Sequence, residues 1–463
     1  MSHRDLLLPA LAIAMLSGCA ATPLPELPAE DVPAAWQKTS AGDDIWPKLD
    51  WWNNFDSEEL SAVIAMVEVQ NLDLQNNERN LQLAQLALRD AGFDLWPTPV
   101  VDFGAGTTYA GSKVGDGDFT DGGVDSFDLS AGFVYSDILS KPTQYDSARA
   151  QYELSLANVA DLRLNTLGTA ASTYFRILLL RDRIKAARQN VENAEAIARI
   201  IEARVNAGTV NQVNLYQQQI AVQRQRNGLA SLMQDEFEAR AALALLLADS
   251  VQDFDVAATT LDDVTIPEIQ PGVPSSLLTR RPDIVQAEAG LKVSRAEVDL
   301  ARLAYLPDIS LTGSVSLVSD SLGDLFDDTT TVSGSASLVQ LILDNGSRGR
   351  NVERQRLELE NALNEYRETV IAAFNDVEVS LGNIELLRAL GDVEAENLKR
   401  AEESFRIAQA RYREGVDDFQ TVLVSQTQLF DARNSYFDNK LAQLNAAIAF
   451  YQSLGGGWEN TAL

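Results

Sequence analysis

Apolar residues recur every three or four positions over two long stretches of the chain, from 142 to 207 and from 347 to 414. This spacing places the apolar side chains on one face of a helix. About 65 residues at ~1.5 Å each give a helix of roughly 100 Å, whereas globular helices average about 11 residues. The many alanines on these faces favour close, coiled-coil-like packing. The two stripes are Leu156, Ala160, Leu164, Leu167, Ala171, Tyr174 and Leu178, and Leu359, Leu363, Tyr366, Val370, Ala373, Val377, Leu381, Ile384 and Leu387.

A second pattern, strict alternation of apolar and small polar residues, occurs in segments near 99–110, 125–138, 307–319 and 331–343. Segments of about ten residues with this alternation are typical of a membrane β-barrel with a wet lumen, although a half-buried soluble sheet has the same pattern. The sequence contains no other sheet for these strands to pack on. Four strands cannot close a barrel, and open sheet edges are not tolerated in lipid. A barrel therefore requires strands from several chains.

The chain repeats itself at an offset of about 210 residues. Asn71-Leu72-Asp73-Leu74 parallels Arg281-Pro282-Asp283-Ile284, and the pair Arg204 and Gly208 parallels Arg411 and Gly415 at an offset of 207. Two copies of one module are therefore predicted, over 57–265 and 266–463. Each copy reads helix, strand, loop, strand, long helix, turn, helix. The shorter helices are expected near 210–248, 276–305 and 417–453.

The N-terminus is typical of an export signal. Residues 1–18 combine a short basic start with an apolar segment that is too short to span a membrane. The segment ends in Leu16-Ser17-Gly18-Cys19, which resembles the lipobox of bacterial lipoproteins and implies cleavage before a lipidated Cys19. Ala20 follows, which by the same resemblance favours sorting to the outer membrane. The alternative is an ordinary signal with an incidental cysteine. Residues 19–56, rich in proline and alanine, are expected to form a linker.

Composition narrows the chemistry. The chain has 37 Lys+Arg against 67 Asp+Glu, and its single His and single Cys lie at positions 3 and 19. A histidine-dependent triad, a His/Cys zinc site and a disulfide framework are excluded, and an acidic excess of 30 charges argues against a nucleic-acid partner. No enzyme, metal or cofactor is expected. Gly115-Asp116-Gly117-Asp118 faintly resembles a calcium loop, but a solvated loop is the preferred interpretation of the Asp-rich segments.

At this point the chain resembles the TolC-type outer-membrane factor family, in its efflux lipoprotein branch. The matching motifs are 277–284 (Leu-Leu-Thr-Arg-Arg-Pro-Asp-Ile), 411–417 (Arg-Tyr-Arg-Glu-Gly-Val-Asp) and 454–458 (Leu-Gly-Gly-Gly-Trp). The resemblance implies an α+β membrane protein: a homotrimer whose twelve strands, four per chain, form one outer-membrane barrel continued by a periplasmic helical tunnel. It also implies a periplasmic adaptor and an inner-membrane pump as partners, with a pump of the resistance-nodulation-division type expected.

The same resemblance assigns roles at the helical tip. The adaptor is expected to contact two turns, Gly208-Thr209-Val210 and Gly415-Val416-Asp417. Relatives close the tip with Asp rings just after the second turn, but here Thr421 and Val424 occupy those positions. Asp417 or Asp418 could supply a displaced ring, or they could simply cap the following helix. Gln420, Thr421 and Val424 could instead form the constriction.

The function expected is a passive efflux conduit in the outer membrane, carrying substrates from pump and adaptor to the exterior. A conduit for type I protein secretion is the alternative within the same class. A non-conducting structural lipoprotein is the alternative from another class, although a helical rod has no need of the four alternating strands.

Overall fold

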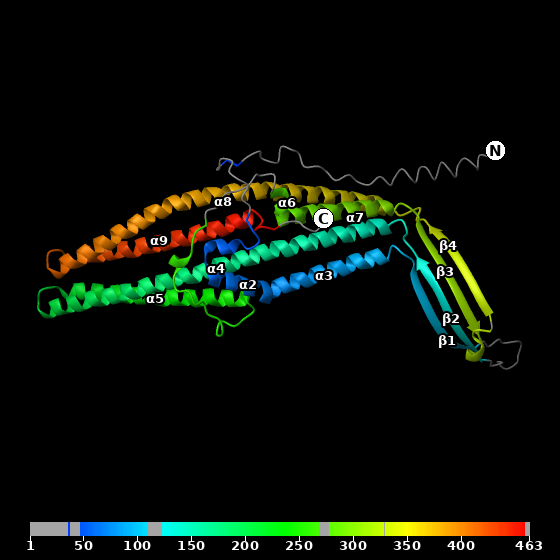
Figure 1. The fold of residues 1–463 in the computed structure, drawn as a ribbon, viewed down its shortest axis with the longest axis horizontal. Coiled ribbons are helices and arrows are strands. Elements are labelled where there is room, and N and C mark those ends of the chain that lie inside the picture. The colour runs from blue at the N-terminus through cyan, green and yellow to red at the C-terminus, as the bar shows by residue number, and fades with distance from the viewer. Residues whose placement is uncertain (1–35, 38–46, 110–122, 268–276, 328, 459–463) are drawn as a thin grey trace. The chain divides into compact units, whose positions relative to one another are not determined.

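The computed structural model describes residues 36–37, 47–109, 123–267, 277–327 and 329–458 (Figure 1). Cys19, Trp46 and the loop residues Asp116 and Asp118 lie outside these ranges. The described chain folds into two compact units. One contains Asn80–Leu156 and Gln286–Tyr366, and the other contains the described residues of Pro28–Arg79, Ala157–Val285 and Arg367–Leu463. Each unit combines segments of both predicted repeats.

The first unit contains one antiparallel sheet in the order β1-β2-β3-β4. The strands are β1 (Thr98–Tyr109), β2 (Gly123–Tyr135), β3 (Asp308–Ser319) and β4 (Thr329–Val339). β1 with β2 and β3 with β4 are long hairpins, one from each repeat, and β2 pairs with β3 to join them. In the same unit, α7 packs on α8 through Leu291, Val298 and Leu359.

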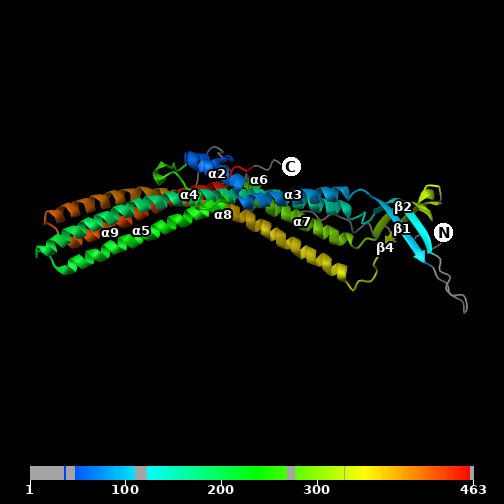
Figure 2. The same ribbon diagram turned by 90° about the horizontal axis from the view of Figure 1, so that it is seen from below.

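The two longest helices are α4 (Lys141–Asn206) and α8 (Ser347–Arg413), at the positions where the apolar stripes predict them. Each is followed by a tight turn and a second helix, α5 (Gln212–Leu246) and α9 (Phe419–Ser453). Toward the two turns, α4, α5, α8 and α9 run side by side (Figure 2). The remaining helices are α2 (Glu58–Gln70), α3 (Leu72–Phe93), α6 (Leu277–Arg280) and α7 (Pro282–Leu303), with short 3-10 turns η2 (Trp51–Phe55), η3 (Leu261–Asp263) and η5 (Leu322–Asp324).

The single helix expected over 276–305 is interrupted at Arg281. Pro282 disfavours helical geometry in the residue before it and has no N–H to donate, so α6 ends and α7 begins there. The first repeat has its own interruption at the equivalent position, Asn71. The Asn71 side chain accepts from the N–H groups of Asp73 and Leu74, which starts α3.

The core of the second unit is built around a tryptophan. Trp51 of η2 is 2% exposed and stacks on Tyr451 of α9 at a centroid distance of 5.4 Å. Phe55 packs against Phe175 of α4 at 5.1 Å. The tryptophans of this segment therefore have a structural role, because they pack the chain before α2 against the long helices.

Beside this core, Arg281 is a buried cation that connects three segments. It donates to Asp283 through Nε (3.0 Å) and Nη2 (2.6 Å), and to Asp376 of α8 (3.1 Å). It also donates to the carbonyl of Ser453 at the end of α9 (3.2 Å). Burial works to lower the pKa of Arg281, but the two carboxylates outweigh burial and raise that pKa. The arginine of the Arg-Pro-Asp motif thus joins α7, α8 and the C-terminal end of α9.

Candidate functional site: a two-faced sheet and a helical tip

The register of the sheet places most of the apolar residues of the four strands on one face. Phe103 lies opposite Leu129, Leu129 opposite Leu317, and Val315 opposite Val332. Gly313 lies on this face under the ring of Phe133; a Cβ on Gly313 would come within 2.6 Å of that ring. An aromatic ring covering a strand glycine is a known way to pin register. The apolar face consists of Val101, Phe103, Ala105, Phe127, Leu129, Ala131, Phe133, Tyr135, Ile309, Leu311, Val315, Leu317, Val332, Ala336 and Leu338.

The opposite face carries mainly hydroxyls and carboxylates, together with Val100, Val134 and Val318. Cross-strand pairs Ser310–Ser337 and Ser314–Ser333 have oxygen–oxygen distances of 2.6 and 2.7 Å. Ser316 donates to Asp128 at 2.6 Å. None of the four strands contains Lys or Arg. One face therefore suits lipid and the other suits water and polar solutes.

The two tip turns of the second unit have the same backbone geometry. Gly208 and Gly415 have φ of +72° and +74°. In the first turn, Gly208 donates to the carbonyl of Val205 and Thr209 to that of Arg204; in the second, Gly415 and Val416 repeat this pattern with Tyr412 and Arg411. These paired bonds form the Schellman motif, in which a left-handed residue, usually glycine, ends a helix. The expected adaptor-contacting residues therefore form two equivalent turns.

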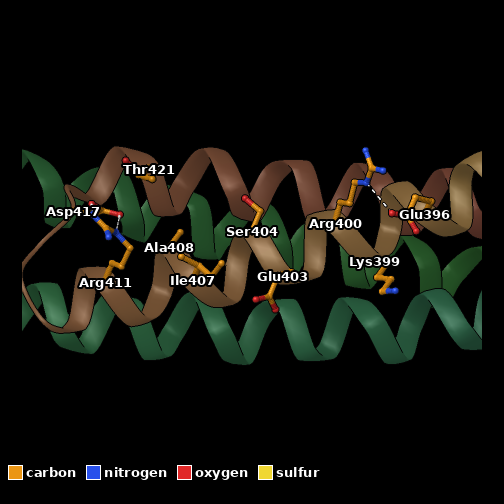
Figure 3. Close-up of a pocket in the computed structure, with 10 residues that line it drawn as sticks. All are labelled: Glu396, Lys399, Arg400, Glu403, Ser404, Ile407, Ala408, Arg411, Asp417 and Thr421. Carbon is orange, nitrogen blue, oxygen red and sulfur yellow. Dashed lines mark hydrogen bonds and ion pairs between the residues drawn. The ribbon is translucent and has the colours of Figure 1, made fainter.

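The candidate gate residues lie at the start of α9, and two of them have defined partners. Asp418 is the N-cap of α9 and accepts from the Thr421 backbone (2.9 Å) and hydroxyl (2.8 Å). Asp417 accepts two bonds from Arg411, at 2.7 and 2.9 Å (Figure 3). The bond from the Thr421 side chain lowers the pKa of Asp418, and the bond from Arg411 lowers the pKa of Asp417. Both side chains are therefore carboxylates at neutral pH. Gln420 and Val424 are exposed on the first turns of α9.

Sequence reasoning missed a contact that joins the two tip hairpins. Arg204 of α4 donates to the carbonyl of Tyr412 on α8 (3.0 Å), and its guanidinium lies 4.5 Å from the centre of the Tyr412 ring. The sequence singles out Arg204 only as the repeat equivalent of Arg411. The sequence does show that the two arginines differ in their surroundings. At the offset of 207, Val205 corresponds to Tyr412 and Val210 corresponds to Asp417. Arg204 thus lacks the acidic partner that Arg411 has.

A shallow groove follows α8 and α9 away from the second turn (Figure 3). Its charged groups are largely paired along α8 and across the turn: Arg400 bonds Glu396 at 2.9 Å, and Arg411 bonds Asp417. Ile407 and Ala408 supply its apolar floor. Nothing in this lining has the composition of a catalytic site. Within the described ranges, no three His, Cys, Asp or Glu side chains gather so as to hold a metal ion.

None of the helices in the described part of the chain contains an apolar stretch long enough to cross a bilayer. A sheet with one mainly apolar face and one hydroxyl-lined face, together with long amphipathic helices ending in exposed turns, has the features of a channel subunit.

Comparison with known proteins identifies the family of this chain. The model of the outer membrane efflux protein family matches residues 63–249 and 273–456. The chain is 32% identical to the pyoverdine export outer membrane protein OpmQ of Pseudomonas aeruginosa, over 97% of this chain and 96% of that protein. It is 24% identical to the cation efflux system protein CusC of Escherichia coli, over 97% and 99%. The chain therefore belongs to the outer membrane efflux protein family.

Solved structures agree on the fold. The Campylobacter jejuni CmeC outer membrane channel superposes with a TM-score of 0.86 at 20% identity, covering 96% of each chain. The outer-membrane channel OprN superposes with a TM-score of 0.84 at 22% identity, covering 95% of this chain. The predicted resemblance to the TolC-type outer-membrane factor family is confirmed: the protein is an outer membrane efflux protein with the TolC fold.

Proposed function

We propose that three copies of this chain form one passive conduit through the outer membrane, with a closed barrel of twelve strands continued by a helical tunnel. The observation that carries this proposal is the register of the four-stranded sheet, which separates an apolar face from a polar face while β1 and β4 remain its edges. Edge strands cannot face lipid, because each unpaired backbone group there costs several kcal/mol. Pairing β4 of one copy with β1 of the next removes every edge.

The remaining assignments follow from this arrangement. Cys19 carries the covalent lipid that anchors the mature N-terminus, and the linker over 19–56 connects it to the folded chain. The turns at Gly208–Val210 and Gly415–Asp417 receive a periplasmic adaptor, which connects the conduit to an inner-membrane pump of the resistance-nodulation-division type. The chain performs no covalent chemistry and needs no cofactor. Support for the turns comes from their exposure and equivalent geometry.

The cargo is proposed to be chosen by the pump and adaptor rather than by this chain. Relatives of similar length carry names that refer to pyoverdine, cations, antibiotics and toluene. The polar sheet face, lined by hydroxyls and carboxylates, has the composition of a general aqueous pathway.

Reconstitution tests the conduit. The purified, lipidated protein is expected to migrate as a trimer in native electrophoresis and to produce stepwise conductance in planar bilayers. A trimer without conductance would support the non-conducting lipoprotein instead, and a monomer without conductance would refute the proposal. The Cys19→Ser variant should lose the mass of the lipid while its barrel still inserts in vitro.

The tip gate is proposed to depend on Asp417 and Asp418. Their carboxylates, ionised at neutral pH, would form a displaced acidic ring that restrains opening and binds divalent cations. The double variant Asp417→Ala/Asp418→Ala should raise single-channel conductance and weaken block by divalent cations. Unchanged conductance and unchanged block would show that Asp418 only caps α9 and that Asp417 only pairs with Arg411. Gln420, Thr421 and Val424 would then be the candidates for the constriction.

A further inference from the structure

After α5, the chain of the second unit passes over α4 and reaches α9 (Figure 1). We call residues 255–262 of this stretch the crossing segment. Val256 and Leu261 of the crossing segment are 2% and 0% exposed, and they belong to the apolar core around Trp51. The crossing segment is therefore fixed against the helices, although most of it has no regular secondary structure.

Charged side chains of α2 and α4 hold the backbone of the crossing segment. Arg181 of α4 donates to two of its carbonyls, one of them that of Ala258 at 2.7 Å. Asp182 of α4, which is 7% exposed, accepts from the Leu261 N–H at 2.8 Å. Glu59 of α2 accepts from the Ala258 N–H at 2.9 Å. Because these bonds go to backbone groups, they fix where the crossing segment lies along α4.

The last residue of the crossing segment reaches α9. Asp262 accepts from Lys440 of α9 at 2.5 Å, and the two side chains are 61% and 15% exposed. At the same level, Arg183 of α4 pairs directly with Asp438 of α9 at 2.5 Å. Since Leu261 is bound to α4 and Asp262 is bound to α9, two successive residues of the crossing segment connect the two helices.

The second repeat lacks the residues that make this fastening. At the offset of 207, Arg181-Asp182-Arg183 of α4 corresponds to Arg388-Ala389-Leu390 of α8. The buried carboxylate and the second guanidinium are therefore missing from α8. The crossing segment thus fastens one helix of the first tip hairpin, α4, to one helix of the second, α9.

The fastening lies far from the tip turns. From Asp182 to its end at Asn206, α4 continues for about 24 residues, or about 36 Å. Over that length, a tilt of about 10° between α4 and α9 moves the end of the helix by about 6 Å. A small movement at the crossing segment therefore corresponds to a large movement at the turns.

We propose that the crossing segment is a conformational restraint on the tip, and that the ion pair between Asp262 and Lys440 breaks when α9 tilts against α4 and the tip opens. The inference rests on the proposed conduit, and it adds a restraint remote from Asp417 and Asp418. A contact shifts an equilibrium between two states only when it differs between them. For one partly exposed ion pair, the expected shift in the ratio of open to closed time is up to about fivefold.

Loosening the restraint is the first test. Lys440→Met removes the ion pair and keeps an unbranched apolar side chain in its place. In planar-bilayer recordings of the purified, lipidated protein, this variant should raise the ratio of open to closed time by up to about fivefold and leave the size of the conductance step unchanged. The matched control is Arg226→Met, which removes an ion pair of 2.6 Å between Arg226 of α5 and Glu195 of α4, within a single hairpin. The control should keep the parental ratio.

Tightening the restraint is the second test, and its expected effect has the opposite sign. In Asp262→Cys/Lys440→Cys, a short bismaleimide that contains a disulfide joins the crossing segment to α9. Cys19 is the only natural cysteine, and the proposed lipid blocks it. Before crosslinking, the ratio of open to closed time should resemble that of Lys440→Met. After crosslinking it should fall below the parental ratio, and cleavage of the linker with dithiothreitol should raise it again.

The recordings separate the possible failures. A parent protein without conductance would overturn the conduit, and the restraint with it. A conducting protein whose ratio of open to closed time changes neither in Lys440→Met nor on crosslinking would overturn the restraint and leave the conduit standing. A lower melting temperature of Lys440→Met with the parental ratio would show that the ion pair only stabilises the fold, and it would also overturn the restraint.

Discussion

The glycines after α9 offer a test of how the C-terminal end holds the second unit together. Gly455 has φ of +82°, and a Cβ built on it would overlap the carbonyl oxygen of Arg280 and lie 2.9 Å from the carbonyl carbon. Gly208 at the tip has a similar φ of +72°, but a Cβ there would meet nothing within 4 Å. The two positions therefore share the backbone penalty and differ only in the clash.

Replacing Gly208 with Ala should cost about 1–2 kcal/mol, the penalty of a left-handed backbone for an L-residue. Replacing Gly455 with Ala should cost that amount and roughly 1–3 kcal/mol more, since overpacking forces backbone shifts of this magnitude. The displaced segment also positions Arg281, so the cost should extend to the network around that cation. Gly290→Ala is the control: this glycine lies within α7, a Cβ there meets nothing within 4 Å, and alanine should stabilise the helix by up to about 1 kcal/mol.

The measurement is the apparent melting temperature of the purified protein in detergent, followed by the fluorescence of buried tryptophans such as Trp51. The expected order is Gly290→Ala at or above the parent protein, then Gly208→Ala, then Gly455→Ala lowest. Equal losses for Gly208→Ala and Gly455→Ala would refute the reasoning, because they would show that the close approach to Arg280 carries no cost.

Three further predictions concern side chains of the second unit. Burial, and then the nearby Asp283, raise the pKa of Asp161 above its usual 3.8, so its ionised form destabilises the fold at neutral pH. The stability that this group contributes is complete below pH 3.8 and is lost as pH rises through the raised pKa; Asp161→Asn should therefore raise the melting temperature at pH 7, with a gain that shrinks toward pH 4. Arg281→Met should lower the free energy of unfolding by about 3 kcal/mol. This is the low end for breaking a buried ion pair, because the Asp283 and Asp376 side chains keep 30% and 55% exposure. Chemical denaturation measures this free energy, and a loss no larger than that of Asp376→Asn would contradict a central role for Arg281. Asp418→Ala should speed amide hydrogen exchange at the start of α9, whereas Asp418→Ser should keep the cap and the slow exchange; equal exchange in the two variants would argue against capping.

Local patterns in the sequence were sufficient to predict the elements. The strands and long helices lie where alternation and three-four spacing predict them, because those periods follow from the geometry of each element alone. The resemblance placed the tip turns at Gly208 and Gly415, and glycine suits both positions because a tight turn after a helix requires a left-handed residue. The interruption at Arg281 was not predicted, since the sequence analysis expects one helix over 276–305.

Partner choice depended on the tertiary structure. Arg411 turns back on Asp417, while its repeat equivalent Arg204 crosses to Tyr412. The sequence shows that Arg204 has Val210 where Arg411 has Asp417, but it does not show which group Arg204 reaches instead. The family gate could not be transferred by motif, because its expected positions hold Thr421 and Val424.

The sequence by itself determined the elements, the duplication, the occurrence of only one His and one Cys, and the family. Only the tertiary structure decided the register that gives the sheet its two faces, the network around Arg281 and which helix faces remain uncovered. The physical reason is the separation along the chain of the residues that interact. Periodicity depends on neighbouring residues, whereas the pairing of Leu129 with Leu317, or of Arg183 with Asp438, depends on distant segments that folding brings together. A slip of one residue in the sheet would move every side chain to the other face without changing the pattern of either strand.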